Sequence, residues 1–276
     1  MSTSAARWWS CVSEPNGRAA RMPRTLRVCA LYPDLMNIYA DRGNLLVLER
    51  RCRWRGLGFE LTASGLGESL DADAHDLLYI GGGQDRDQRL CAEDLLEFKR
   101  DALHEAAARE AVVLGVCGGY QLLGRSYTLG EERIEGVGLL DLTTVREDAP
   151  RLIGNAAIEV HFDDDVRDGG GEHAGPDARV LAGFENHGGR TSLGADQAPL
   201  GRVLHGNGND GRSGFEGARR GNTIGTYLHG PLLPKNVWFA DWLIARALGI
   251  AEDELSPLDD ELEREAHLAA RRAAGV

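Results

Sequence analysis

The stretch VLGVCGGYQLLG, residues 113–124, places one cysteine between an apolar run and a segment of helix-forming residues. The run AVVLGV, residues 111–116, has the length and composition of a strand that is buried on both faces. Gly118 and Gly119 follow Cys117 and open the helix-like part. Strand, sharp turn and helix in direct succession predict a β–α unit, the element from which α/β folds are built.

Two earlier segments repeat this order of strand and helix. The runs LRVCALY (26–32) and DLLYI (76–80) are compact and apolar, and helical spacing follows each of them, over 37–56 and 87–110. Repeated alternation predicts an α/β fold with a mostly parallel open sheet flanked by helices, of the flavodoxin-like kind. The second half of the chain has shorter alternating segments, such as TIGTYLH (223–229), and predicts additional antiparallel strands.

The length of 276 residues fits one large domain with additions at its ends. We expect the domain to cover 25–250, after a poorly ordered extension over 1–24 and before a C-terminal helical tail over 251–276. The Asp- and Gly-rich segment 163–178 has too little apolar surface to offset the entropy of ordering it, so we expect a mobile loop. The spaced ligands of a calcium loop are missing there, and we expect no metal site.

Composition excludes several classes of protein. The apolar runs are far shorter than the roughly 20 residues that cross a bilayer, so we expect a soluble chain that does not span a membrane. A net charge of -12 argues against nucleic acid as a partner, because Lys and Arg supply most non-specific affinity for phosphates. The five cysteines are scattered and form no CxxC pair, which argues against zinc and favours a reducing cytoplasm.

Cys117 stands where a nucleophile elbow would place it, in a G-x-C-x-G sequence. Such a turn strains the central residue, and flanking glycines allow close approach of neighbouring strands. The following helix N-terminus favours a thiolate, and its free N–H groups can bind an oxyanion. The alternative is a buried structural cysteine, as we expect for Cys29 within its apolar strand, and the turn alone leaves both interpretations open.

A thiolate nucleophile also needs a base and an oxyanion site. The glycines 81–83 follow a parallel strand and so lie at the same carboxyl edge as Cys117, where one of their amides would join that of Gly118. His229 ends the run TIGTYLH and would present its imidazole at a sheet edge. His187 in FENHGGRT is the second candidate for the base.

Four motifs in one order, YIGGGQDRDQ, GVCGGYQLLG, GFENHGGRTSLG and GTYLHGPLLPKN, resemble class I glutamine amidotransferases of the cobyric acid synthase type. The resemblance runs from about Leu26 to Leu248 and implies the fold of that class. It implies that Cys117 attacks the side-chain amide of L-glutamine and that His229 is the general base that later protonates ammonia. It also implies that Arg151 holds the glutamine, although its residue type alone favours a surface salt bridge.

The resemblance extends the list of site residues and leaves one role open. Many class I enzymes carry an acid two positions after the catalytic histidine, where this chain has Pro231. A dyad, or a carboxylate from Glu185 or from a partner protein, would replace that acid. The remaining candidates are Gly82, Gly83, Gly118 and Gln121 for substrate binding, with Gln121 equally able to face the sheet, and Asn186 and His187 as orienting or pocket residues.

Within this group the chain is especially similar to the glutaminase subunits of lipid II isoglutaminyl synthases. This implies a heterodimer with a Mur ligase-like synthetase subunit of the MurT type, to which ammonia passes for amidation of D-glutamate in lipid II. No GxxxxGK[ST] phosphate loop is present, so we expect no cofactor here and ATP and Mg on the partner. The expected location is the cytoplasm near the inner membrane face. The alternatives are a glutaminase for cobyrinic or cobyric acid amidation and a cysteine hydrolase on a similar fold.

Overall fold

The computed structural model describes residues 24–38, 41–160, 162 and 180–276. The expected mobile loop and all but the last residue of the expected N-terminal extension therefore lie outside the described residues. Within the described ranges, no helix combines the length and the apolar character needed to span a bilayer.

The centre of the fold is a six-stranded sheet with the order β13-β14-β4-β3-β1-β2. Five neighbouring strands are parallel, and β13 pairs antiparallel with β14 at one edge. The parallel strands follow the flavodoxin-like order, which confirms the predicted fold class. Their bounds are β1 (Thr25–Leu31), β2 (Gly58–Ser64), β3 (Leu77–Ile80), β4 (Val112–Val116), β13 (Ala218–Arg220) and β14 (Thr223–Thr226).

Two strands of this sheet differ from the sequence-based prediction. The segment containing β14 was expected among the added antiparallel strands, but it pairs parallel with β4, with Thr226 opposite Val116. All four residues of β14 are buried, as an interior strand of a parallel sheet requires. The edge strand β2 was not predicted, because most of its residues are exposed and its sequence lacks an apolar run.

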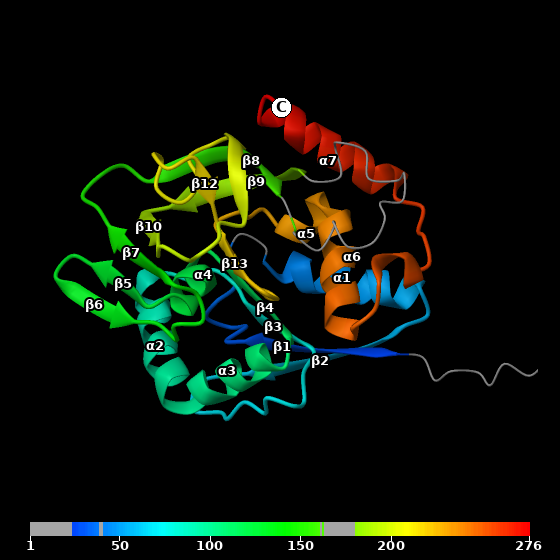
Figure 1. Ribbon diagram of the computed structural model, residues 1–276, viewed down its shortest axis with the longest axis horizontal. Coiled ribbons are helices and arrows are strands. Elements are labelled where there is room, and N and C mark those ends of the chain that lie inside the picture. Colours follow the sequence, from blue (N-terminus) through cyan, green and yellow to red (C-terminus); the bar gives the residue numbers. More distant parts are fainter. Residues whose placement is uncertain (1–23, 39–40, 161, 163–179) are drawn as a thin grey trace, which may run out of the picture.

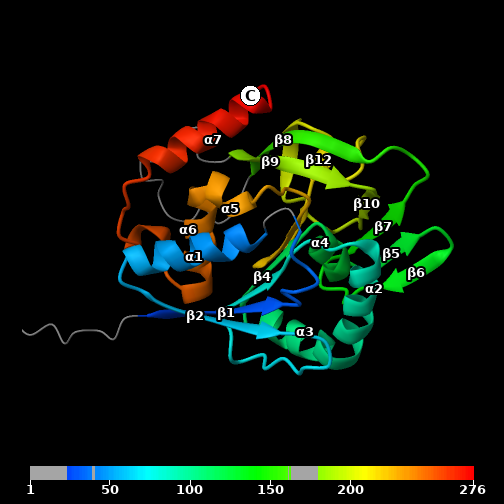
Figure 2. The ribbon, with the colours of Figure 1, turned by 180° about the vertical axis from the view of Figure 1, so that it is seen from behind.

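Helices cover both faces of the sheet (Figures 1 and 2). One face carries α1 (Arg42–Trp54) and α6 (Val237–Leu248), and the other carries α2 (Asp85–Asp94), α3 (Arg100–Ala108) and α4 (Gly118–Leu123). The long helix predicted over 87–110 is interrupted, because a π-helical segment, η1 (Leu95–Lys99), joins α2 to α3. The remaining helices are α5 (Leu232–Lys235), the 3-10 segment η4 (Glu252–Glu254) and α7 (Glu261–Ala273).

Two smaller sheets lie beyond the carboxyl ends of the parallel strands (Figure 1). Their orders are β10-β7-β5-β6 and β12-β11-β8-β9. All their pairs are antiparallel except β5 with β7, so the predicted additional antiparallel strands are confirmed with one parallel exception. Their bounds are β5 (Ser126–Leu129), β6 (Glu132–Glu135), β7 (Leu142–Arg146), β8 (Leu152–Val160), β9 (Val180–His187), β10 (Gly189–Leu193), β11 (Gly201–His205) and β12 (Phe215–Glu216).

The C-terminal helix α7 packs against the sheet that contains β8 and β9 (Figure 2). The Asn155 side chain donates a hydrogen bond of 2.9 Å to the carbonyl of Ala273. Ala274 is buried with Ala157 and Val180 in a small apolar cluster. The charged tail expected from the sequence is therefore docked along one side of the domain.

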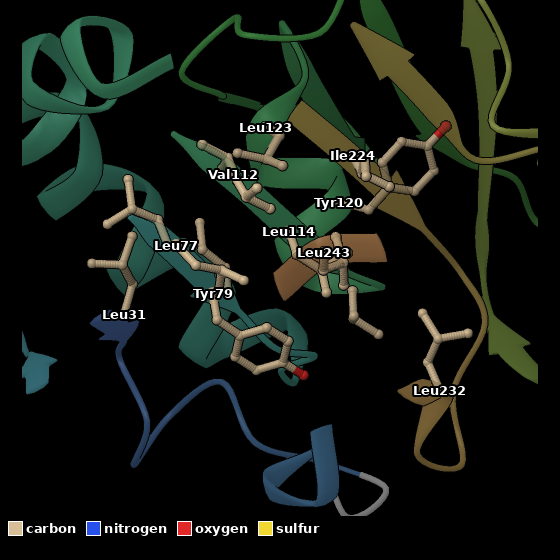
Figure 3. Packing of buried hydrophobic residues seen from close by; sticks show 14 of the residues in the cluster. Leu31, Leu77, Tyr79, Val112, Leu114, Tyr120, Leu123, Ile224, Leu232 and Leu243 are labelled. Carbon is tan, nitrogen blue, oxygen red and sulfur yellow. The ribbon is translucent and has the colours of Figure 1, made fainter. Parts of the chain in front are cut away.

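The short helix α4 lies close against the central sheet, next to the apolar side chains shown in Figure 3. A Cβ on Gly119 would lie 2.3 Å from the carbonyl oxygen of Ile80, and one on Gly225 would lie 1.9 Å from the ring of Tyr120. Neither distance leaves room for a side-chain carbon. Glycines on both the helix and the strand therefore set the position of the α4 N-terminus.

Gly119→Ala tests this packing. The added methyl group would meet a backbone oxygen that cannot rotate away, so we expect the free energy of unfolding to fall by roughly 1–3 kcal/mol. Chemical denaturation measures the change. Gly154→Ala is the matched control, because a Cβ there meets no atom within 4 Å. An equal loss of stability in both variants would contradict the explanation.

Candidate active site

Cys117 connects the end of β4 to α4 in a strained backbone conformation. Its φ of 52° and ψ of -102° lie in a region that non-glycine residues rarely adopt. Its amide donates a hydrogen bond of 2.8 Å to the carbonyl of Thr226, which ties the turn to the end of β14. The side chain is 7% exposed. These are the features of a nucleophile elbow, and they match the turn predicted from the sequence.

His229 lies three residues beyond β14 and is fixed by the neighbouring sheet. Its backbone forms an isolated antiparallel bridge with Phe184 of β9, with N–O distances of 2.7 and 3.1 Å. Its side chain is fully buried. Burial by itself lowers the pKa of this imidazole, but the Cys117 thiolate and the Asp41 carboxylate raise that pKa to about 10. Next to these two negative charges, the structure favours the imidazolium form of His229.

Asp41 supplies the carboxylate that the sequence left unassigned. Its Oδ1 lies 3.6 Å from Nδ1 of His229, and both side chains are at most 1% exposed. Its Oδ2 accepts a hydrogen bond of 2.7 Å from the amide of Gly82, which fixes the carboxylate. The site thus has the arrangement of a catalytic triad, in which Cys117 is the nucleophile, His229 the imidazole and Asp41 the orienting acid.

Sequence reasoning missed Asp41 because the residue directly precedes α1. Asp at that position usually caps the helix with its side chain, but Asp41 makes no such hydrogen bond. The loop between β1 and α1 does lie at the carboxyl edge of the sheet, where ligands bind in this architecture. An acid in that loop was therefore the signal that could have identified it.

Glu185, the candidate for the acid that orients the base, has other partners than His229 in the structure. Glu185 is fully buried and accepts hydrogen bonds from the backbone and side chain of Asn207, each 2.6 Å long, and from the amide of Gly208. Its Oε2 lies 4.0 Å from Nε2 of His187. Glu185 therefore holds the loop after β11.

The glycine loop after β3 contributes two different groups to the site. The N–H of Gly82 donates to Asp41 and is therefore directed at the acid. Gly83 lies beside Gly118, because a Cβ on Gly118 would be 3.0 Å from the nitrogen of Gly83. Of the glycines in this loop, Gly83 is therefore the one whose N–H can join that of Gly118 as an oxyanion donor. Gly82 holds the Asp41 carboxylate instead.

A cavity of about 330 Å³ opens beside Cys117, and Gln121, Arg151, His187 and Gly83 also line it. Arg151 is held by Asn186, to which its Nε and Nη2 donate two hydrogen bonds of 2.7 Å. Asn186 therefore orients the arginine. A larger cavity of about 580 Å³ between α3 and the β13–β14 hairpin is lined by none of these residues.

Gln121 and His187 form one wall of the cavity through Tyr227. The Gln121 amide donates to the Tyr227 hydroxyl at 3.1 Å, so of the two expected orientations the structure shows the one facing the pocket. The His187 ring stacks on Tyr227 with centroids 3.6 Å apart. Burial lowers the pKa of His187 to about 3, and its Nδ1 donates to the carbonyl of Gly189. A ring with so low a pKa is a weak base, so His187 is a poor alternative to His229.

The described part of the chain contains no group of three or more His, Cys, Asp or Glu side chains that is arranged to hold a metal ion. The groups available at the site are therefore a thiol, an imidazole, a carboxylate, backbone amides and guanidiniums. Together they are suited to nucleophilic attack on an amide carbonyl.

Comparison with known proteins assigns this arrangement to a family. The model of the CobB/CobQ-like glutamine amidotransferase domain matches residues 27–237, a span that includes Cys117, His229, Asp41 and Arg151. The chain belongs to this family. This amidotransferase is therefore a member of the class that the four motifs suggested, and it is an enzyme that uses glutamine.

Two curated relatives match most of this amidotransferase. It is 37% identical over 227 residues to the lipid II isoglutaminyl synthase (glutamine-hydrolyzing) subunit GatD of Streptococcus pneumoniae, with 82% of each chain covered. It is 36% identical to the protein of the same name from Staphylococcus aureus, with 87% of this chain and 90% of that protein covered. The solved structure of PurLQS from Thermotoga maritima shares the fold, with a TM-score of 0.53, 19% identity and coverage of 90% and 99%.

Proposed function

We propose that this amidotransferase is the glutaminase subunit of a lipid II isoglutaminyl synthase. The observation that carries the proposal is the set of Cys117, His229 and Asp41 beside a cavity that Arg151 lines. The similarity to the two GatD subunits over most of the chain supports the particular role. In this role the chain hydrolyses L-glutamine to glutamate and ammonia.

Acylation begins when the Cys117 thiolate attacks the side-chain amide carbon of glutamine. A C–S bond forms, the carbonyl π electrons move to oxygen, and the N–H groups of Gly83 and Gly118 stabilise that oxyanion. The imidazolium of His229 then donates its proton to the amide nitrogen. The C–N bond breaks, ammonia leaves, and a glutamyl thioester remains on Cys117.

Deacylation reverses the proton transfer at His229. The imidazole, now neutral, accepts a proton from water, and the resulting hydroxide attacks the thioester carbon. The C–S bond breaks, the new carboxylic acid loses its proton to solvent, glutamate departs, and the thiolate–imidazolium pair is restored. Asp41 acts through His229, because its carboxylate orients the ring and stabilises its positive charge in the resting state.

Arg151 recognises the other end of the substrate. Its guanidinium can form a bidentate pair with the α-carboxylate of glutamine. Asn186 holds the guanidinium before substrate binds, which reduces the entropy lost on binding.

Ammonia becomes useful only where a carboxylate has been activated. We assign that step to a Mur ligase-like partner of the MurT type, which would use ATP and Mg to activate the α-carboxyl of D-glutamate in lipid II. The heterodimer would work in the cytoplasm near the inner face of the membrane, where its lipid substrate is anchored. This chain needs no cofactor for amide hydrolysis, since its own residues supply nucleophile, acid and base.

Cys117→Ala tests the nucleophile. We expect glutamate release from glutamine to fall by roughly 1,000-fold or more, as measured by coupled detection of glutamate with the partner present. Cys91→Ala, which changes another buried cysteine, is the control and should retain activity. Retained activity in the Cys117 variant would remove the mechanism.

Asp41→Asn tests the orienting acid. Because the pKa of His229 is raised to about 10, the imidazolium persists below that pH, and kcat should fall only as pH rises through about 10. Without the carboxylate this alkaline limb should move to lower pH, and kcat should drop by roughly 100-fold. The exposed Asp34→Asn is the control. An unchanged pH profile in the Asp41 variant would exclude the assignment.

Transfer of labelled nitrogen tests the acceptor. The chain is co-purified with a Mur ligase-like protein from the same genome and given ATP, lipid II and glutamine labelled with heavy nitrogen in its side-chain amide. We expect the label in the α-amide of the lipid II peptide by mass spectrometry, and none with Cys117→Ala. Labelled ammonia released into solution while lipid II stays unamidated, or label in a corrin carboxamide, would contradict lipid II as the acceptor.

A further inference from the structure

Asp85 is a carboxylate in the wall of the catalytic cavity that has no role in the mechanism above. Among the described residues that line this cavity, it is the only acidic one. We propose that Asp85 binds the α-ammonium group of glutamine and so selects a free amino acid over an amide that lacks the α-amino group. The inference rests on the proposed glutaminase function.

The Asp85 carboxylate is fixed in place by the sheet that contains β5 and β7. It begins α2 directly after the glycine loop, and its Oδ1 accepts a hydrogen bond of 3.2 Å from the Tyr127 hydroxyl. Its Oδ2 accepts one from Arg146. A carboxylate has about four acceptor sites, so two hydrogen bonds leave capacity for a ligand, and the side chain is 42% exposed.

Arg146 and Arg151 meet at the same end of the cavity. A Cβ built on Gly188 would lie 3.4 Å from Nε of Arg146 and 3.6 Å from Nη1 of Arg151. Asp85, which is paired with Arg146, is therefore near the arginine proposed to bind the α-carboxylate. The carboxylate and the ammonium group of an amino acid are bonded to the same carbon. A binding site for both groups therefore needs a cation and an anion side by side, as Arg151 and Asp85 provide.

The charged side chains that line the cavity offer partners of both signs to a zwitterionic ligand. Its two guanidiniums are Arg146 and Arg151, and Arg146 is paired with Asp85. Arg151 is left to attract the carboxylate, while the Asp85 carboxylate attracts the ammonium. A general preference for acids at a helix N-terminus would explain Asp85 and Asp87 equally, but only Asp85 lines the cavity.

The experiment compares glutamine with glutaramate, which has the same carboxylate and side-chain amide but no α-amino group. KM for glutamine and the Ki of glutaramate as a competitive inhibitor are measured for the full chain with its partner. The proteins are the wild type, Asp85→Asn, Asp87→Asn and Arg151→Met. Asp87→Asn removes the same charge from the same helical turn and is the matched control.

We expect Asp85→Asn to raise KM for glutamine roughly 10- to 100-fold, the range for a hydrogen bond to a charged group, and to leave the Ki of glutaramate unchanged. Arg151→Met should raise both constants, and Asp87→Asn neither. Equal effects of Asp85→Asn on both compounds, no effect on either, or the same effect from Asp87→Asn would overturn the inference. Absence of glutamine hydrolysis in the wild-type complex would instead contradict the proposed function.

Discussion

The first turn of α4 lies against the carboxyl ends of the central strands with no space for a side chain at Gly119, and this close approach governs the rest of the site. In the turn just before it, Cys117 has a strained backbone conformation, and Gly118 lies beside Gly83. The positions of the thiol and of the proposed oxyanion donors thus depend on this one packing contact. The apolar core around β4 supports that contact (Figure 3), because its buried strands give α4 a fixed surface to pack on.

The electrostatics of the site come from three distant parts of the chain. Asp41 precedes α1, Cys117 follows β4, and His229 follows β14, so the fold must form before their charges can meet. The acid is on a loop of the parallel sheet, so the position two residues after His229 does not have to be acidic and is Pro231 here. Gly230 and Pro231 instead form the turn of the backbone after His229. Gly230 has a φ of 97°, a value that favours glycine.

The strands β1, β3 and β4 and the turn at Cys117 could be predicted from the sequence, because burial on both faces leaves an uninterrupted apolar run. The strand β2 could not, since an edge strand keeps exposed polar residues such as Glu60. The residue types of Cys117 and His229 carried their own signal. The local sequence around Asp41 indicates a helix cap, which is a stronger local signal than that of a catalytic acid. Only the tertiary arrangement distinguishes a helix cap from a catalytic acid at this position. Arg151 needed the resemblance, because a single arginine has no pattern.

The backbone bridge between His229 and Phe184 joins the two halves of the molecule at the point of chemistry. The nucleophile belongs to the parallel sheet, but the imidazole is suspended between that sheet and β9. The C-terminal helix α7 packs on the far side of β8 and β9. The distance between thiol and imidazole therefore depends on how the layer that contains β9 packs against the parallel sheet, and not on the parallel strands alone.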